Sequence, residues 1–307
     1  MNTNKNKTLI VILGPTAVGK TAMAINIARQ FNTEIISADS RQFYRELNIG
    51  VASPSPDELS AAKHHFIGNL SIHDDYNVSK YETEALQCLE EIFKTKDTAV
   101  LVGGSGLYID AVCKGIDELP DPEVSLREEI KHLFQQEGVE ALRSQLRILD
   151  PVYYNEVDLA NPKRLMRAIE VCLTTGKTYS SLRINHQLQR PFHIIKIGLT
   201  REREELYNNI NRRVDLMIEN GLLDEVKGLQ DFKGLNALNT VGYKELFAYL
   251  EDECSLTTAL EKIKVNSRRY AKRQLTWFRR YEEIFWFDAQ NTTAIIEYLN
   301  AKILIQS

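Results

Sequence analysis

Apolar runs alternate with amphipathic segments over the first third of the chain. Residues 8–13 form a continuous apolar run rich in β-branched residues, which is typical of a strand buried on both faces of a parallel sheet. Shorter apolar segments at 34–37 and 99–102 predict two further strands, and the stretches at 20–31 and 78–95 are predicted to be helices. Strands that alternate with helices indicate a doubly wound α/β sheet.

The pattern changes after Asp117. A proline-bearing break at 119–122 is followed by charged, amphipathic stretches at 125–149 and 162–174, which have helical spacing and no strand pattern. These features predict an all-helical insertion into the α/β core.

Strand pattern returns at 193–199 and leads into long helical stretches. These helical stretches cover residues 202–231, 242–251 and 255–281. We expect this part of the chain to rejoin the sheet. The predicted core therefore comprises residues 1–117 and 193–307, and the predicted inserted domain comprises residues 118–192.

The composition is that of a globular protein. With 307 residues, 43% of them hydrophobic and 26% charged, the chain can bury a substantial core. Its four cysteines are far apart and form no disulfide framework or zinc pattern, which fits a reducing cytoplasm. There is no apolar run of membrane-spanning length and no signal-peptide pattern, so we expect no membrane association and take a monomer as the default.

The distribution of positive charge is uneven. A net charge of -4 and a pI near 6.0 argue against a general affinity for nucleic acid. Residues 262–281, however, carry eight lysines and arginines, Lys272 and Arg273 among them, with interleaved aromatic residues and no acidic one. This pattern suits an RNA surface, although a solvated helix with an aromatic core stripe explains it equally well. A second basic group consists of Lys163, Arg164 and Arg167.

One segment between a predicted strand and a predicted helix has the phosphate-loop pattern G-x-x-x-x-G-K-[ST]. It consists of Gly14, Pro15, Thr16, Ala17, Val18, Gly19, Lys20 and Thr21. In such a loop backbone N–H groups and a helix N-terminus surround phosphate oxygens, the lysine neutralises charge and the hydroxyl can hold Mg²⁺. The pattern predicts a polyphosphate site but leaves open whether the phosphate is transferred, hydrolysed or a leaving group.

Two further polar segments follow predicted strands and should reach the same rim of the sheet as the phosphate loop. The first contains Asp39, Ser40, Arg41 and Gln42. Asp39 is a candidate base, although a carboxylate after a strand is also a common helix N-cap. The second segment, Gly103-Gly104-Ser105-Gly106, permits close approach of a ligand to the backbone and offers the Ser105 hydroxyl.

These segments, in this order, resemble the tRNA dimethylallyltransferase family, also called tRNA isopentenyltransferase. Later motifs extend the resemblance along the chain. They are Asn161–Glu170 (similar to P-x-R-[LI]-x-R-A-[LI]-E), Leu206–Met217 (similar to L-Y-x-R-I-x-x-R-V-D-x-M), Thr240–Glu245 (G-Y-K-E) and the basic Tyr270–Phe278 segment.

The resemblance implies a P-loop NTPase-like core, with a parallel sheet flanked by helices, and an inserted helical domain that contacts tRNA. It implies transfer of a dimethylallyl group from dimethylallyl diphosphate to the exocyclic amine of adenosine 37, next to the anticodon. The products are N6-isopentenyladenosine and diphosphate. The implied partners are the tRNA anticodon stem-loop and dimethylallyl diphosphate, and the implied cofactor is Mg²⁺.

The resemblance also assigns roles to residues. Asp39 accepts the amine proton, Arg213 stabilises the leaving diphosphate with Lys20 and the loop, and Thr21 holds Mg²⁺ together with the diphosphate. Arg213 by itself has the pattern of an ordinary helix arginine. The residues expected to bind tRNA are Asp39, Ser40, Arg41, Gln42, Ser105, Arg127, Lys163, Arg164, Leu165, Met166, Arg167, Lys272 and Arg273.

The chain departs from the family pattern at two positions that bear on the site. Asn209 stands where an arginine is usual, which removes one positive charge four residues before Arg213 on the same predicted helix. This departure puts the substrate preference in question rather than the reaction. Ser105 stands where threonine is common and keeps the hydroxyl group.

Three other functions are compatible with parts of the pattern. A small-molecule kinase would use the same phosphate loop, but the apolar segments that end in Asp110 and Asp288 are weak candidates for its second motif. A prenyltransferase acting on free adenine nucleotides would need no basic RNA surface. An RNA-binding nucleotide switch would bind nucleotide without prenyl transfer.

Overall fold

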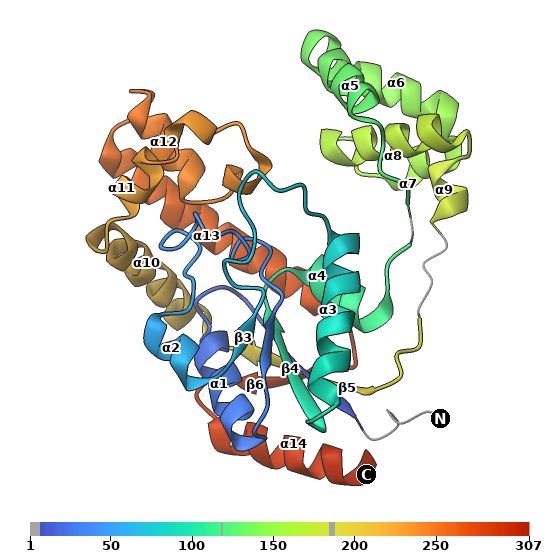
Figure 1. The fold of residues 1–307 in the computed structure, drawn as a ribbon. Coiled ribbons are helices and arrows are strands. Elements are labelled where there is room, and N and C mark those ends of the chain that lie inside the picture. The colour runs from blue at the N-terminus through green and yellow to red at the C-terminus, as the bar shows by residue number, and fades with distance from the viewer. Residues whose placement is uncertain (1–6, 118, 184–187, 307) are drawn as a thin grey trace. The chain divides into compact units, whose positions relative to one another are not determined.

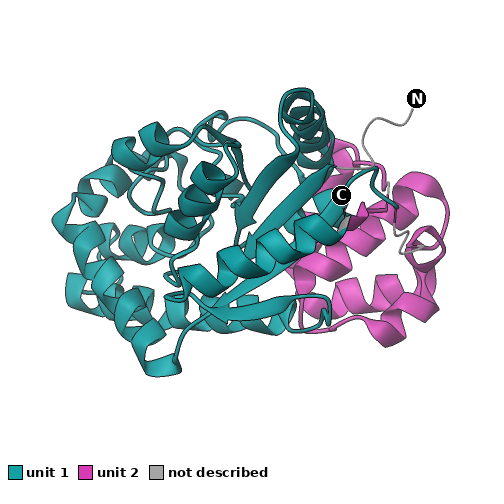
Figure 2. Cartoon of the chain, turned by 90° about the horizontal axis from the view of Figure 1, so that it is seen from below, with its two compact units in different colours: residues 1–113, 189–307 teal, residues 114–188 magenta. Residues whose placement is uncertain are grey.

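The computed structural model describes residues 7–117, 119–183 and 188–306. The chain forms two compact units, which Figure 2 colours separately: unit 1 is Met1–Cys113 with Gln189–Ser307, and unit 2 is Lys114–Leu188. Residue 118, where the insertion is predicted to begin, lies outside the described residues. Within the described part of the chain, no helix combines the length and apolar character needed to cross a membrane.

A parallel sheet forms the centre of unit 1 (Figure 1). Its six strands have the order β3-β2-β4-β1-β5-β6. The strands are β1 (Thr8–Leu13), β2 (Ile35–Ser37), β3 (His64–His65), β4 (Thr98–Gly103), β5 (His193–Thr200) and β6 (Phe285–Asp288). In β1 every residue is buried, and the strand pairs with β4 on one side and β5 on the other. The loops after β1, β2 and β4 therefore leave the same edge of the sheet side by side.

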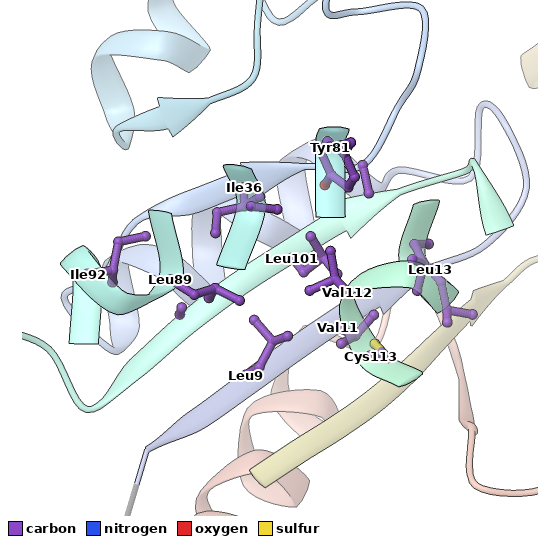
Figure 3. Packing of buried hydrophobic residues seen from close by; sticks show 14 of the residues in the cluster. Leu9, Val11, Leu13, Ile36, Tyr81, Leu89, Ile92, Leu101, Val112 and Cys113 are labelled. Carbon is purple, nitrogen blue, oxygen red and sulfur yellow. The ribbon is translucent and has the colours of Figure 1, made fainter. Parts of the chain in front are cut away.

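Helices cover both faces of the sheet. On one face Leu9, Val11 and Leu13 pack against α3 (Val78–Phe93) and α4 (Gly106–Lys114), and Figure 3 shows this cluster closely. The alternate residues of β1 face the other side, because successive side chains of a strand point to opposite faces. There they pack against α1 (Lys20–Gln30), α10 (Arg203–Glu219) and α14 (Thr292–Gln306).

The remaining helices of unit 1 lie next to the sheet, and most of them form a second, helical core. They are α2 (Pro56–Ala61), α11 (Leu222–Lys227), η1 (Gln230–Phe232), η2 (Asn236–Leu238), α12 (Tyr243–Leu250) and α13 (Leu256–Phe278). Apart from α2 and η1, these elements contribute buried side chains, with Tyr243 completely buried, to one cluster with the end of α10. This core places α10 and α13 beside the carboxyl edge of the sheet.

Unit 2 is all helical. Its helices are α5 (Val124–Glu137), α6 (Val139–Leu149), α7 (Pro151–Glu156), α8 (Pro162–Thr175) and α9 (Tyr179–Leu182). Their apolar faces form a separate core. The buried carboxylate of Asp150 accepts hydrogen bonds from the Tyr153 N–H at 2.9 Å and the Ser180 N–H at 2.7 Å, so it joins α7 to α9.

The fold class predicted from the sequence is confirmed: the sheet is parallel and helices flank it. Two long helical predictions are interrupted. The stretch at 125–149 is divided at Gly138 (φ 75°), and the stretch at 202–231 is divided at Gly221 (φ 96°), since glycine adopts positive φ without a steric penalty. The prediction missed β3, which has only two residues, and β6, the other edge strand.

Candidate active site

The phosphate loop is the turn between β1 and α1. Gly14 has φ 151°, and a Cβ there would lie 2.7 Å from the Leu199 carbonyl oxygen, so no larger residue fits between β1 and β5. Ala17 and Gly19 also have positive φ, which coils the chain tightly before α1 begins. The loop therefore meets the first turn of a helix, whose N–H groups have no helical acceptors and attract anions.

Lys20 is the first residue of α1, and its ammonium group donates to the Pro15 carbonyl at 2.9 Å. The pKa of Lys20 is lowered to about 8: burial is the main cause, the Asp39 charge raises the pKa, and the nearby Arg213 has a smaller lowering effect. Two cations close together in a partly desolvated place stabilise an anion between them. Lys20 is thus suited to hold a phosphate oxygen.

Arg213 reaches the same loop from α10. Its guanidinium group donates a hydrogen bond to the Thr16 hydroxyl. Burial lowers the pKa of Arg213, and the Asp39 carboxylate acts in the opposite direction. The structure therefore brings Arg213, Lys20 and Asp39 together, although their positions in the sequence are far apart.

Gln274 on α13 is a part of the site that sequence reasoning missed. Its side-chain oxygen accepts from the Thr16 N–H at 2.8 Å, and its side-chain N–H donates to the Gly104 carbonyl at 3.0 Å. The residue is only 5% exposed. One amide thus joins the loop after β1 to the loop after β4. Its position beside Lys272 and Arg273 in a basic segment gave no signal of this role.

Asp39 follows β2 and begins a turn. Its carboxylate accepts from the Arg41 N–H at 3.1 Å, and no helix lies between residues 40 and 55, so the helix N-cap explanation is excluded. The next residue, Ser40, receives contacts from the other loop: its N–H donates to the Ser105 hydroxyl oxygen at 3.1 Å, and the two hydroxyls are 3.2 Å apart. Asp39 and Ser105 therefore belong to one constellation.

Tyr270 completes this side of the site. Burial and the Asp39 charge raise the pKa of its phenol to about 12, while a hydrogen bond with Ser105 has a smaller opposite effect. The phenol is neutral near pH 7 and keeps its proton as a hydrogen-bond donor. Tyr270 also borders the smaller of two cavities at the site.

Arg41 and Gln42 are already engaged with the protein. The Arg41 guanidinium group donates to the carbonyls of Asn236 at 2.9 Å and Ala237 at 3.1 Å. Gln42 donates to the Ala52 carbonyl at 2.9 Å. Both side chains hold the loops around Asp39 in place.

Two cavities meet at Asp39. The larger, about 480 Å³, is lined by phosphate-loop residues and by the segment that follows β2, with one face of α10. The smaller, about 100 Å³, lies toward α12 and α13. The residues that line both are Thr16, Asp39, Val51 and Arg213. Of the phosphate loop, Thr16, Ala17, Gly19, Lys20 and Thr21 line the larger cavity, whereas Gly14, Pro15 and Val18 are buried behind it.

The loop that carries Val51 is held by Glu225. This α11 carboxylate accepts from the N–H groups of Asn48, Ile49 and Gly50, at 3.2, 2.7 and 3.0 Å, and from the Tyr243 hydroxyl at 2.5 Å. Sequence reasoning missed this role, because Glu225 stands 175 residues after Gly50. Its four donors fix one wall of both cavities.

Metal binding would need oxygen atoms from a ligand. Within residues 7–117, 119–183 and 188–306, no three His, Cys, Asp or Glu side chains group in a way that could hold an ion. Mg²⁺ commonly uses one or two protein oxygens and takes the rest from phosphate and water. The Thr21 hydroxyl lines the larger cavity beside Asp39, so the residues present fit an ion that arrives with a polyphosphate.

Of the basic residues expected at the RNA surface, several lie exposed. Lys163 and Arg164 are exposed on the first turn of α8, after the Asn161 side chain that caps the helix. Lys272 and Arg273 are exposed on α13. These four side chains carry charges that are open to solvent in their respective units.

Other residues of the α8 group have structural roles in unit 2. Leu165 is completely buried and packs in its core, so its side chain presents no surface to RNA, and Met166 packs against the same core. Arg127 and Arg167 flank the buried carboxylate of Glu170, with N···O distances of 3.7 and 3.6 Å. The two arginines are held side by side by one acidic residue.

The aromatic residues at the C-terminal end of α13 and just after it pack against the protein. Phe278 is 1% exposed, and the Trp277 N–H and Tyr281 hydroxyl both donate to the Asp110 carboxylate, at 3.1 and 2.6 Å. This arrangement favours the core-stripe interpretation of the sequence over base stacking. It also assigns Asp110 a structural role, and neither Asp110 nor Asp288 lines either cavity.

Fold and site define a phosphate-loop α/β enzyme in which a polyphosphate cradle and a carboxylate share one cavity. Residues 42–281 match the model of the family described as IPP transferase. The chain is also 52% identical over 297 residues to tRNA dimethylallyltransferase 1 of Bacteroides thetaiotaomicron, covering 97% of this chain and 96% of that protein. The chain belongs to the IPP transferase family.

Solved structures agree. The tRNA isopentenylpyrophosphate transferase of Bacillus halodurans is similar with a TM-score of 0.73 and 35% identity, covering 98% of each chain. A eukaryotic dimethylallyltransferase acting on tRNA is similar with a TM-score of 0.76 and 25% identity, covering 92% of this chain and 74% of the other. The likeness therefore includes the phosphate loop, which precedes the residues matched by the family model.

Proposed function

We propose that this protein transfers the dimethylallyl group of dimethylallyl diphosphate to the N6 amine of adenosine 37 in tRNA. The proposal depends on one observation: the two cavities at the site are lined in part by the same residues, which form a shared wall. Thr16, Asp39 and Arg213 line both, so a diphosphate in the larger and an adenine in the smaller would meet at one carboxylate. The names of the relatives support both substrates.

The larger cavity suits the diphosphate. Its volume of about 480 Å³ lies within the range of small-ligand sites. Lys20, Arg213 and the loop N–H groups place positive charge where the allylic ester releases its diphosphate. The negative charge on the diphosphate increases as the carbon–oxygen bond breaks. These positive groups therefore bind the transition state more tightly than the substrate.

Asp39 acts on the nucleophile. The N6 lone pair forms a bond to the C1 carbon of the prenyl group while the C1–O bond breaks, and its electron pair leaves with the diphosphate. The Asp39 carboxylate accepts the N6 proton, which leaves a neutral secondary amine. The Ser105 hydroxyl contacts Ser40, the residue after Asp39, and Tyr270 lies near the Asp39 charge, so both would help to hold the loop that carries the base.

We propose Mg²⁺ as the cofactor, held by the Thr21 hydroxyl together with the diphosphate oxygens. When bound, it supplies positive charge that neutralises the leaving diphosphate. Thr21 is positioned for this by the first turn of α1. Asp39 remains available for the proton because the ion takes its other ligands from diphosphate and water.

We assign the contacts with tRNA to exposed lysine and arginine side chains. Lys272 and Arg273 on unit 1, and Lys163 and Arg164 on unit 2, would bind phosphates of the anticodon stem-loop, and Arg127 and Arg167 form a second pair on unit 2. The target adenine must leave its stack to reach Asp39, at a cost of a few kcal/mol that these contacts offset. The four free cysteines support a reducing, cytoplasmic setting, and we expect a monomer.

The test is a choice of acceptor. Radiolabelled dimethylallyl diphosphate and Mg²⁺ are offered with unmodified tRNA, with free AMP, or with neither. We expect label in tRNA only. Label in AMP alone would instead identify a free-nucleotide prenyltransferase. Absence of transfer, with ATP binding retained, would refute prenyl transfer and favour a kinase or a nucleotide switch.

A further inference from the structure

One face of α10 forms part of the larger cavity. The residues on it are Asn209, Arg212, Arg213 and Leu216. Their spacing of three and four residues places them on one stripe of the helix. Asn209 is the position where the family resemblance leads one to expect an arginine, and an amide carries no charge toward a diphosphate. The cavity nevertheless has two arginines from this helix.

The cations of this cavity differ in what they already contact. Lys20 donates to the Pro15 carbonyl and Arg213 to the Thr16 hydroxyl, so both are fixed to the phosphate loop. Arg212 is exposed and has no hydrogen bond or ion pair with any residue that the structure describes. The acidic residue three positions further on, Asp215, pairs instead with Lys264 at 2.9 Å.

The acidic residues that border the cavity do not neutralise Arg212 either. Glu58 accepts from the Ser55 N–H at 2.9 Å and belongs to the capping box of α2. The Asp39 carboxylate accepts from the Arg41 N–H. Arg212 therefore presents an unneutralised guanidinium group at the border of the phosphate site, and guanidinium groups bind phosphate oxygens in pairs.

We propose that Arg212 is a further diphosphate-binding residue, which supplies from the next turn the positive charge that Asn209 lacks. The inference rests on the proposed function, because it assumes that the larger cavity holds dimethylallyl diphosphate. Lys20 and Arg213 hold the diphosphate against the loop, and Arg212 contacts its solvent-facing oxygens. Since Arg212 is exposed, its contribution is screened by salt more strongly than that of Arg213.

The direct probe is inorganic pyrophosphate with Mg²⁺, titrated calorimetrically into the full-length protein. We expect Arg212→Gln to weaken pyrophosphate binding about tenfold at low salt, and less at high salt. Arg203→Gln removes the same charge from an exposed position of α10 outside this cavity, and should leave binding within about twofold. Adding Asn209→Arg to Arg212→Gln should restore most of the affinity.

The inference is wrong if Arg212→Gln and Arg203→Gln change pyrophosphate affinity equally, or if Asn209→Arg gives no rescue. Arg212→Lys, which keeps the charge, should lose less affinity than Arg212→Gln; equal losses would point to a steric effect. Failure of the proposed function would look different. The wild-type protein would then transfer no prenyl group to tRNA, while the dependence of pyrophosphate binding on Arg212 would remain measurable.

Discussion

The Arg213 guanidinium group donates a hydrogen bond to the Thr16 hydroxyl, across 197 residues of sequence. This contact attaches α10 to the phosphate loop and holds both side chains at the wall shared by the two cavities. The helix thereby delivers a half-buried positive charge to the point where the diphosphate would separate from the prenyl group.

Replacing Arg213 with glutamine should lower kcat by about 10²- to 10³-fold, because the charge acts mainly on the developing diphosphate. Thr16→Val removes only the hydroxyl and should lose less than tenfold. Steady-state kinetics with tRNA at saturating Mg²⁺ measure both. An Arg213→Gln enzyme with unchanged kcat and only a higher KM would show that the arginine binds substrate and transition state alike.

Lys20 is partly buried beside another cation, at a cost in stability. Its folded pKa of about 8 lies below the ordinary value of 10.5. The unfolded chain thus binds more protons between these values, so this group opposes folding fully below pH 8 and progressively less as pH rises from 8 to 10.5. Lys20→Met should abolish transfer and raise the free energy of unfolding at pH 7 by roughly 1 kcal/mol.

Denaturant unfolding of Lys20→Met and wild type at pH 7 and pH 10 measures this effect. The stability difference should shrink at the higher pH. The same titration predicts that pyrophosphate binds less tightly as pH rises through 8, since the free enzyme loses the Lys20 proton there. A stability difference that does not change with pH would refute the assignment to this charge.

Glu225 should matter for both substrates, because it fixes the loop that lines both cavities. Glu225→Gln replaces one accepting oxygen by an NH2 group, which cannot accept a hydrogen bond from the backbone N–H groups that face it. The substitution should therefore lower the free energy of unfolding by about 1–3 kcal/mol. KM for dimethylallyl diphosphate and for tRNA should both rise. Tyr243→Phe removes one of the four donors and should have the smaller effect. A change confined to one substrate would disprove the shared-wall role.

Lys163 and Arg164 should bind RNA phosphates. Their joint replacement by alanine should raise KM for tRNA about tenfold and reduce its dependence on salt, without changing KM for dimethylallyl diphosphate. Lys177→Ala, at an exposed position after α8, is the matched control. If the control raises KM for tRNA as much as the double variant does, the effect reflects general charge and not a defined contact.

The sequence predicted the sheet and the phosphate loop because both depend on local patterns. The run at 8–13 and the motif at 14–21 each require only neighbouring residues. It failed for α14, in which polar and apolar residues are mixed around the helix without the period of an amphipathic helix. Gln274 and Glu225 could not be found in this way, since their partners lie far along the chain and are fixed only by the fold.

The aromatic residues of the basic helix show the same limit. Trp277 and Phe278 have the spacing that either RNA stacking or packing would require, and only the position of Asp110 and the burial of Phe278 distinguish the two. Leu165 shows the same limit of sequence-based prediction. The two residues before it, Lys163 and Arg164, are exposed, whereas Leu165 itself faces the core. A sequence shows how many charged residues a segment has, but it does not show which way each side chain points.

We propose that Asp39 receives the proton of the adenine amine at the meeting point of the two cavities. The most direct test is the single-turnover rate of prenyl transfer to tRNA by Asp39→Asn, compared with wild type. We expect a loss of about 10²- to 10⁴-fold with little change in the affinity for dimethylallyl diphosphate. An Asp39→Asn enzyme that transfers at a rate close to the wild type would contradict it.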